Sequence, residues 1–172
     1  MKRALNRIAS EIKKKNKTID NLAFIGIKRR GATLAQQLAK ILSKPQKKIP
    51  IGAIDINLYR DDLQLVAETP IVRGSEIDFD INDKIIVLVD DVIFTGRTIR
   101  AALTEILDFG RPKAIQLAVL IDRGHRELPI VPDYVGKRII TRKEDLIDIF
   151  VEDEDGKEGV FISKANKTNV SE

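Results

Sequence analysis

The spacing of apolar residues predicts an alternation of helices and strands along the first 122 residues of the chain. Residues 2–15 and 32–42 each carry an apolar stripe at the spacing of an α-helix. The apolar run NLAFIGI at residues 21–27 lies between them and predicts a buried strand. This strand and the helix that follows it form one predicted βα unit.

The middle of the chain repeats this pattern. Residues 85–89 are a continuous run of β-branched residues and leucine, typical of a strand covered on both faces. Residues 98–109 resume helical spacing before the stop signal GRP, and the run AIQLAVLID at residues 114–122 predicts the next strand. Alternating strands and helices favour an α/β fold, with an open, mostly parallel sheet and right-handed crossovers.

Other segments depart from this alternation. In residues 51–62 apolar side chains alternate with polar ones, which predicts a strand near a sheet edge. Residues 60–84 have no sustained period and predict a long connection of a kind that is often functional. Beyond residue 122, short apolar pieces such as YVGKRI and LIDIFV predict a small β-rich appendage over about residues 124–172. The length of 172 residues predicts a single domain over residues 1–172.

Composition narrows the class of protein. Hydrophobic residues make up 43% of the chain and charged residues 33%, as in an ordinary soluble domain. The chain has no cysteine, which excludes disulfides and cysteine-based metal sites, and no apolar run approaches membrane-spanning length, so we expect a cytoplasmic protein.

The charges are spread unevenly along the chain. Residues 1–143 carry 27 Lys and Arg against 17 acidic residues, whereas residues 144–172 carry 3 Lys and Arg against 9 acidic residues. A basic body is either a solvated surface or an attractor of phosphorylated metabolites and nucleic acid.

Charged residues gather where the predicted strands end, which is where ligands bind in open α/β sheets. Four such ends carry KRRG (residues 28–31), YRDD (59–62), DDVIFTGRT (90–98) and DR (122–123). Three of the four combine a cation with a carboxylate. The expected ligand therefore carries both anionic groups and hydroxyls.

The segment at residues 90–98 has the most specific chemistry. Its turn TGRT precedes a predicted helix, so backbone N–H groups and hydroxyls can surround a phosphate at the positive end of that helix. Asp90 and Asp91 suit the vicinal hydroxyls of a sugar, provided that the backbone turns there, because successive strand side chains point to opposite faces. A nucleotide-binding P-loop is excluded, since Asp91 occupies the position of its first Gly.

The stretch IIVLVDDVIFTGRT at residues 85–98 resembles the 5-phosphoribosyl-1-pyrophosphate (PRPP) signature of type I phosphoribosyltransferases. The segments RALNRIASEI, GIKRRG, DINLYRDDL, RPKAIQLAVLIDRGHRELPI and DYVGK are similar to bifunctional regulators of pyrimidine operon attenuation that are also uracil phosphoribosyltransferases. The similarity covers the chain to about Lys137. It implies a type I phosphoribosyltransferase fold with a small β-rich hood, and transfer of phosphoribosyl from PRPP to uracil, giving UMP and pyrophosphate.

The resemblance also implies a role for each candidate residue. Asp90 and Asp91 would hold the ribose hydroxyls, and Arg60 would begin a mobile loop that closes over the catalytic site. Lys28, Arg29, Arg30 and Gly31 would meet the pyrophosphate with Mg²⁺. The 5′-phosphate would be held by Thr95, Gly96, Arg97 and Thr98, and the other expected PRPP- or UMP-binding residues are Val92, Ile93 and Phe94. Asp122 would serve the metal through a water, and Asp122 and Arg123 would lie on the uracil side.

A second implied activity is UMP-dependent binding to the mRNA leader of a pyrimidine operon, by a homodimer or higher homo-oligomer. The candidate RNA contacts are His125, Arg126, Lys137, Arg138, Arg142 and Lys143. The chain departs from the family's pattern at Asn6, Ser10 and Val131. Two alternatives therefore stay open: a phosphoribosyltransferase for another base without RNA regulation, and an RNA-binding regulator with vestigial catalysis.

Overall fold

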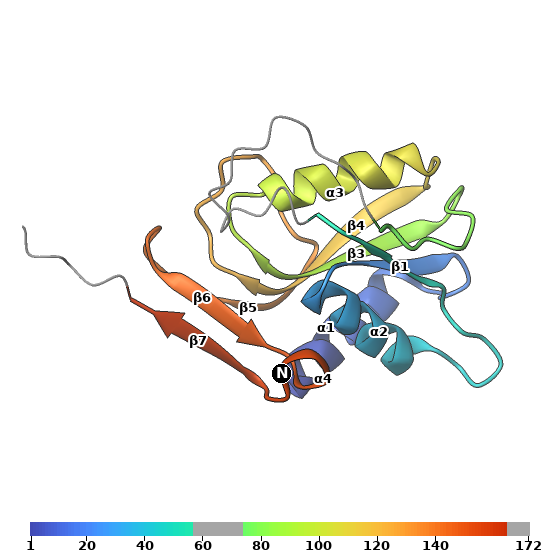
Figure 1. Ribbon diagram of the computed structural model, residues 1–172. Coiled ribbons are helices and arrows are strands. Elements are labelled where there is room, and N and C mark those ends of the chain that lie inside the picture. Colours follow the sequence, from blue (N-terminus) through green and yellow to red (C-terminus); the bar gives the residue numbers. More distant parts are fainter. Residues whose placement is uncertain (57–73, 165–172) are drawn as a thin grey trace, which may run out of the picture.

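A parallel sheet forms the centre of the protein, whose computed structural model describes residues 1–56 and 74–164 (Figure 1). In spatial order its strands are β2 (Ile51–Ile54), β1 (Leu22–Ile27), β3 (Ile85–Ile93), β4 (Ala114–Asp122) and β5 (Tyr134–Arg138). Every pairing between neighbours in this sheet is parallel. The predicted α/β class with a parallel sheet is confirmed.

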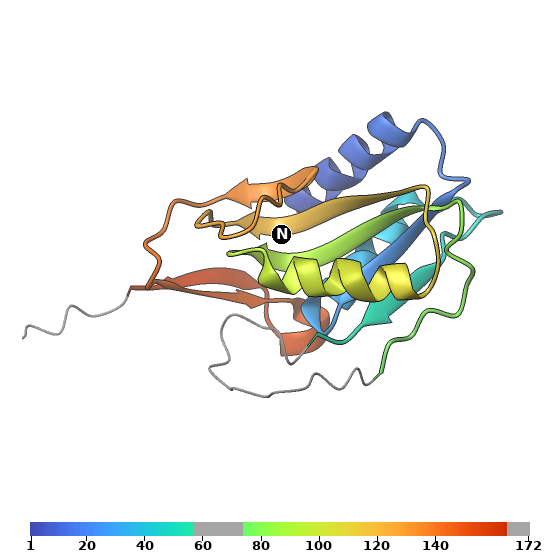
Figure 2. The same cartoon turned by 90° about the horizontal axis from the view of Figure 1, so that it is seen from above.

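Helices cover both faces of the sheet (Figure 2). α1 (Lys2–Asn16) and α2 (Arg30–Leu42) pack on one face, and α3 (Arg97–Asp108) packs on the other. Each helix buries the apolar stripe that its spacing predicts, and an apolar core lies on each face. β1 is buried along its whole length because it is covered on both sides.

A small antiparallel hairpin completes the described chain. Its strands are β6 (Leu146–Phe150) and β7 (Gly159–Ser163), and the short helix α4 (Glu152–Asp155) lies between them in sequence. Figures 1 and 2 both place the hairpin beside the carboxyl ends of β3 and β4. We call residues 141–164 the hood.

Two strand predictions are wrong. The piece YVGKR was expected in the appendage but forms β5 of the main sheet, where Gly136 lets the strand lie against β4: a Cβ there would come within 2.4 Å of the carbonyl oxygen of Leu120. β3 does not end at Val89 but runs to Ile93, because its last residues pair with β4 as far as Asp122. The acid pair therefore lies within a strand.

The strand predicted over residues 51–62 is described only in part. β2 is an edge strand, as expected, while residues 57–62 lie outside the described residues. After residue 73 the chain returns along this edge, and Ala53 and Glu76 exchange two backbone hydrogen bonds. Across residues 1–56 and 74–164, no helix is long and apolar enough to span a bilayer.

Candidate functional site

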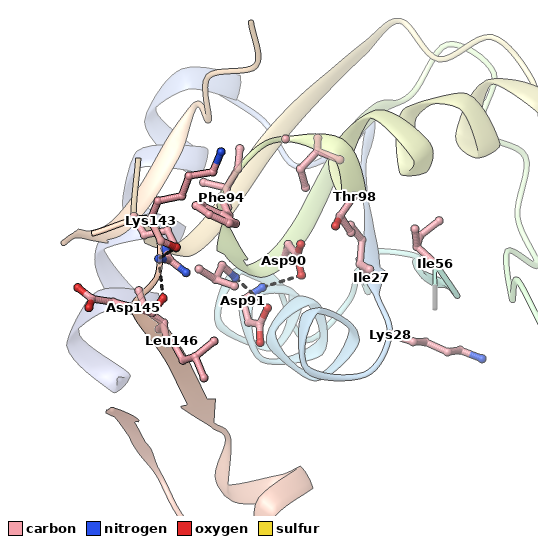
Figure 3. Close-up of a pocket in the computed structure, with 16 residues that line it drawn as sticks. Ile27, Lys28, Ile56, Asp90, Asp91, Phe94, Thr98, Lys143, Asp145 and Leu146 are labelled. Carbon is pink, nitrogen blue, oxygen red and sulfur yellow. Dashed lines mark hydrogen bonds between the residues drawn. The ribbon is translucent and has the colours of Figure 1, made fainter. Parts of the chain in front are cut away.

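A cavity of about 250 Å³ opens at the carboxyl edge of the sheet, between the strand ends and the hood (Figure 3). The residues predicted for PRPP, UMP or catalysis that line it are Lys28, Asp90, Asp91, Val92, Ile93, Phe94, Gly96, Thr98 and Arg123. The cavity therefore gathers the ends of β1, β3 and β4, as the strand-end rule predicts. Arg60 lies outside the described residues.

Asp90 and Asp91 are adjacent in β3 and both are buried, with exposed fractions of 7% and 6%. The strand does not turn between them, since the register with β4 is unbroken on either side. Asp90 therefore faces the side of α3, and Asp91 the side of α2, although both line the cavity. The Oδ1 atom of each accepts the N–H of the next residue, at 2.9 and 2.8 Å. The regular alternation of faces stops just after the pair, because Val92 packs on the α2 side and Ile93 on the α3 side, and both acids open into the one cavity.

The turn between β3 and α3 carries backbone groups that could donate to an anion. Gly96 precedes the helix with a φ of 95°, a left-handed conformation that glycine adopts readily, and Gly96 and Thr98 line the cavity. The N–H groups of a helix's first turn have no intrahelical partner, so this turn offers donors to a phosphate. Thr95 and Arg97 do not line the cavity: Thr95 is buried, and Arg97 Nε donates to Glu127 at 2.9 Å.

The segment after β1 approaches β3 closely. A Cβ on Gly31 would lie 2.5 Å from the carbonyl oxygen of Val89 and 3.2 Å from the Cα of Asp90, so only glycine permits this contact. The peptide bond between Lys28 and Arg29 is cis. Lys28 lines the cavity while its Nζ donates to Glu76 at 2.6 Å, and Arg29 is exposed.

Arg30 does not line the cavity but contacts two carboxylates. Its Nε and Nη2 donate to Asp155 of the hood at 3.0 and 3.1 Å, and its Nη1 lies 3.9 Å from Oδ2 of Asp91. The Asp155 carboxylate, through these hydrogen bonds, raises the pKa of Arg30. Of the four predicted pyrophosphate residues, Lys28 is the one that lines the cavity, although its side chain points away from the acid pair toward Glu76 (Figure 3).

Arg123 lines the cavity but uses its donors within the protein. It is 7% exposed, and its Nη2 donates to the carbonyl oxygens of Arg142 and Asp145 at 2.9 and 2.7 Å. Burial lowers the pKa of Arg123, and the carboxylate of Asp145 opposes that shift. Arg123 therefore holds the hood loop against the end of β4.

Asp122, predicted as a metal and uracil-side residue, does not line the cavity. Its Oδ1 accepts hydrogen bonds from Arg126 Nη2 at 2.6 Å and from the N–H of Gly124 at 3.0 Å. Its Oδ2 lies 3.8 Å from Nε of Arg138. Through these contacts Asp122 anchors the segment that follows β4.

The predicted RNA contacts fall into separate places. His125 Nε2 lies 2.7 Å from the carbonyl oxygen of Thr141, and Arg126 also donates to the carbonyl oxygen of Phe94 at 2.8 Å, so both bind the chain itself. Lys143 lines the cavity, and Arg142 is exposed on the hood loop. Lys137 and Arg138 line an open groove between α1 and β5, together with Arg7.

Sequence reasoning missed the part of the cavity that the hood supplies. Asp145, Leu146 and Ile147 line it, beside Lys143 (Figure 3). Their apolar and acidic pattern resembles that of an ordinary edge hairpin, and no local signal in the sequence tells which cavity such a hairpin covers. The contact depends on Arg123, which binds residues about twenty positions away.

Comparisons with known proteins agree with this geometry. Residues 1–154 match the family described as phosphoribosyl transferase domain. The chain is 56% identical over 166 residues to the bifunctional protein PyrR of Acetivibrio thermocellus, covering 96% of this chain and 90% of that protein, and 55% identical to that of Thermoanaerobacter sp., covering 94% and 92%. The crystal structure of a purine phosphoribosyltransferase from Pyrococcus horikoshii superposes with a TM-score of 0.62 at 30% identity, covering 80% of this chain and 81% of that one. The predicted fold is confirmed, and the chain belongs to the phosphoribosyltransferase family, with the bifunctional PyrR proteins among its relatives.

Proposed function

We propose that the protein transfers the phosphoribosyl group of PRPP to uracil, giving UMP and pyrophosphate. The observation that carries this proposal is that the buried acid pair, Asp90 and Asp91, opens into the same cavity as the turn at Gly96 and Thr98. Carboxylates accept hydrogen bonds from ribose hydroxyls, and the backbone N–H groups at the start of α3 can donate to the 5′-phosphate of the same sugar. A cavity of about 250 Å³ suits one sugar phosphate with a small base.

In the proposed reaction the bond between C1 of the ribose and the pyrophosphate breaks, a bond from C1 to N1 of uracil forms, and N1 loses its proton. The sugar gains oxocarbenium character on the way, so the negative charges of Asp90 and Asp91 stabilise the transition state. Leu146, Ile147 and Phe94 supply apolar walls that exclude the water able to hydrolyse PRPP. No covalent nucleophile is needed.

The carboxylates of the cavity fit a Mg²⁺ that arrives with the substrate. Within the described ranges no three His, Asp or Glu side chains cluster as a protein-only metal site, so diphosphate oxygens and waters would complete a shell begun by Asp90 or Asp91. A bound Mg²⁺ would neutralise the charge of the leaving diphosphate. Asp122 lies outside the cavity and is engaged by Arg126, which makes it a poorer ligand than the acid pair.

The test is calorimetry with PRPP and Mg²⁺, followed by uracil, together with pyrophosphate release in the presence of uracil, hypoxanthine or guanine. We expect PRPP to bind only with Mg²⁺ and release to depend on uracil. Pyrophosphate release that depends on hypoxanthine or guanine instead would show that the base is a purine and not uracil. A protein that does not bind PRPP would contradict the proposed reaction.

We also propose UMP-dependent binding of a pyrimidine operon mRNA leader, through the groove between α1 and β5. The specific observation is that three basic residues, Arg7, Lys137 and Arg138, line this groove beside the acids Glu11 and Asp133, and that the Arg138 side chain is 75% exposed. Asn6, Ser10 and Val131, where the chain departs from the family's pattern, are all exposed on segments that border it. RNA phosphates would be neutralised by the basic side chains, while the bases would be read by hydrogen bonds.

The test for RNA binding is filter binding with and without UMP at several salt concentrations. The double variant Lys137→Ala, Arg138→Ala should weaken binding and reduce the salt slope by about two. The control Lys40→Ala, Lys44→Ala removes the same charge in the last turn of α2 and just after it, and should change little. Equal losses in both variants would leave only nonspecific attraction.

Assembly and location complete the proposal. A homodimer or higher oligomer would cover part of the exposed apolar surface of the hood hairpin, where Leu146, Phe161 and Ile162 are 61%, 54% and 45% exposed. Light scattering after gel filtration measures this directly, and a monomer at micromolar concentration would contradict it. Because the proposed substrates and the mRNA leader are cytoplasmic, we propose that the protein works in the cytoplasm.

A further inference from the structure

The acidic helix α4 of the hood binds one stripe of α2. Three successive acids each accept hydrogen bonds from one side chain of that helix: Asp155 from Arg30, Glu154 from Thr33 and Asp153 from Gln37. Residues three and four apart share a helix face, so this stripe runs along α2 from its first residue. The acidic helix α4 thus has a defined partner within the protein.

One of these three contacts reaches the cavity wall. The guanidinium of Arg30 is held by both oxygens of Asp155, and its remaining nitrogen, Nη1, lies 3.9 Å from Oδ2 of Asp91. Asp155 is itself fixed, because its Oδ2 also accepts the N–H of Val151 at 2.7 Å. The side chains of Arg30 and Asp155 are 29% and 19% exposed, so water screens this pair only in part.

The charges explain why the contact matters. A planar guanidinium can make two parallel hydrogen bonds to only one carboxylate along a given edge. Asp155 occupies the edge formed by Nε and Nη2, which leaves Arg30 at the longer distance of 3.9 Å from Asp91. Without the charge of Asp155, the guanidinium is free to turn and take up the oxygens of Asp91.

We propose that Asp155 is a positioning residue for the sugar site: through Arg30, it sets how closely a cation engages Asp91 and so how well Asp91 accepts the ribose hydroxyls. This inference rests on the proposed phosphoribosyl transfer. It also gives the hood a second role, since the hairpin that covers the cavity carries the acid that orients Arg30.

The test compares Asp155→Asn with Asp153→Asn. Both changes remove one negative charge from the same helix, but the partner of Asp153 is the neutral Gln37, which lies about two turns further along α2 than Arg30, the residue beside Asp91. We expect Asp155→Asn to lower kcat/KM for PRPP and the affinity for UMP by about tenfold, and Asp153→Asn to change either by less than about twofold. Thermal denaturation verifies that both variants are folded. Equal losses of kcat/KM and UMP affinity in the two variants would show that α4 only holds the hood against α2, and would overturn the proposal.

A double-mutant cycle with Arg30→Gln tests the route. If Asp155 acts through Arg30, Asp155→Asn has no further effect on UMP affinity in the Arg30→Gln background. Additive losses would show that Asp155 acts by another path. UMP affinity is independent of turnover, so a wild-type protein that binds UMP but transfers nothing to uracil would refute the proposed reaction while leaving this cycle readable.

Discussion

The guanidinium carbon of Arg123 lies 4.1 Å from the centre of the Phe94 ring, a cation-π contact beneath the hood. The same guanidinium donates to carbonyl oxygens of the hood loop, the shortest bond being 2.7 Å to Asp145. One buried side chain therefore joins the end of β4, the turn between β3 and α3, and the hood. The cavity keeps its shape because these three parts share one anchor.

Arg123→Lys should loosen this anchor. Lysine keeps the charge but has neither the planar face for Phe94 nor the spread of donors for several carbonyl groups. We expect the free energy of unfolding to fall by about 2 kcal/mol, because carbonyl groups lose charged partners in a buried place. Urea denaturation measures this, with Arg111→Lys at an exposed position as the control. An equal loss of unfolding free energy in Arg123→Lys and Arg111→Lys would show that Arg123 does not hold the hood in place.

Asp91→Asn should lower turnover by more than about tenfold, because the amide keeps the shape of the carboxylate but not its charge. The Asn Oδ1 can still accept the N–H of Val92, so the backbone should hold. Steady-state pyrophosphate release with saturating PRPP and uracil gives the rate, and circular dichroism confirms folding. An unchanged rate would remove Asp91 from the catalytic set.

Gly31→Ala should disturb the acid pair through the backbone. The added Cβ would meet the carbonyl oxygen of Val89 at 2.5 Å, and the backbone there cannot move aside as a flexible side chain would. We expect a loss of about 1–3 kcal/mol in the free energy of unfolding, and weaker UMP binding in the fraction that folds. Thermal denaturation measures the stability, and calorimetry measures the UMP affinity. Wild-type values of both would mean that α2 moves aside with no loss of stability.

The parts of the site that sequence predicts are those that follow a local rule. Asp90, Asp91, Gly96 and Thr98 come directly after a buried run and before a helical stripe, and parallel strands bring such ends together. The family that these residues resemble is confirmed. The faces of the two acids were left open by the sequence, since that depends on whether the strand continues, and pairing with β4 decides it.

The parts that sequence could not predict depend on long-range contacts. YVGKR has too few residues to show whether it joins a hairpin or the main sheet, and its place beside β4 is settled by the close approach at Gly136. The hood enters the cavity because Arg123 binds its carbonyl groups and α4 binds α2. Neither contact leaves a periodic signal, and an acidic run such as EDED equally fits a solvated surface.

Glu105 gives the protein a pH-dependent stability that a single substitution should remove. This α3 carboxyl is only 7% exposed and accepts a hydrogen bond from Ser75, and burial, with Asp55 and Asp108 nearby, raises its pKa above the ordinary 4.5. The folded state therefore binds this proton more tightly than the unfolded state. Its stabilising effect is complete below about pH 4.5 and is lost as the pH rises through the folded value.

Glu105→Gln keeps a neutral group beside Ser75 at every pH. We expect the variant to be at least as stable as the wild type at pH 7, and its advantage to shrink as the pH falls toward 4.5, because the wild-type carboxyl takes up its proton more readily in the folded state. Urea denaturation from pH 4.5 to 8 measures both curves, with the exposed Glu144→Gln as the control for removing one charge. Parallel curves for wild type and Glu105→Gln would show that another group sets the pH dependence.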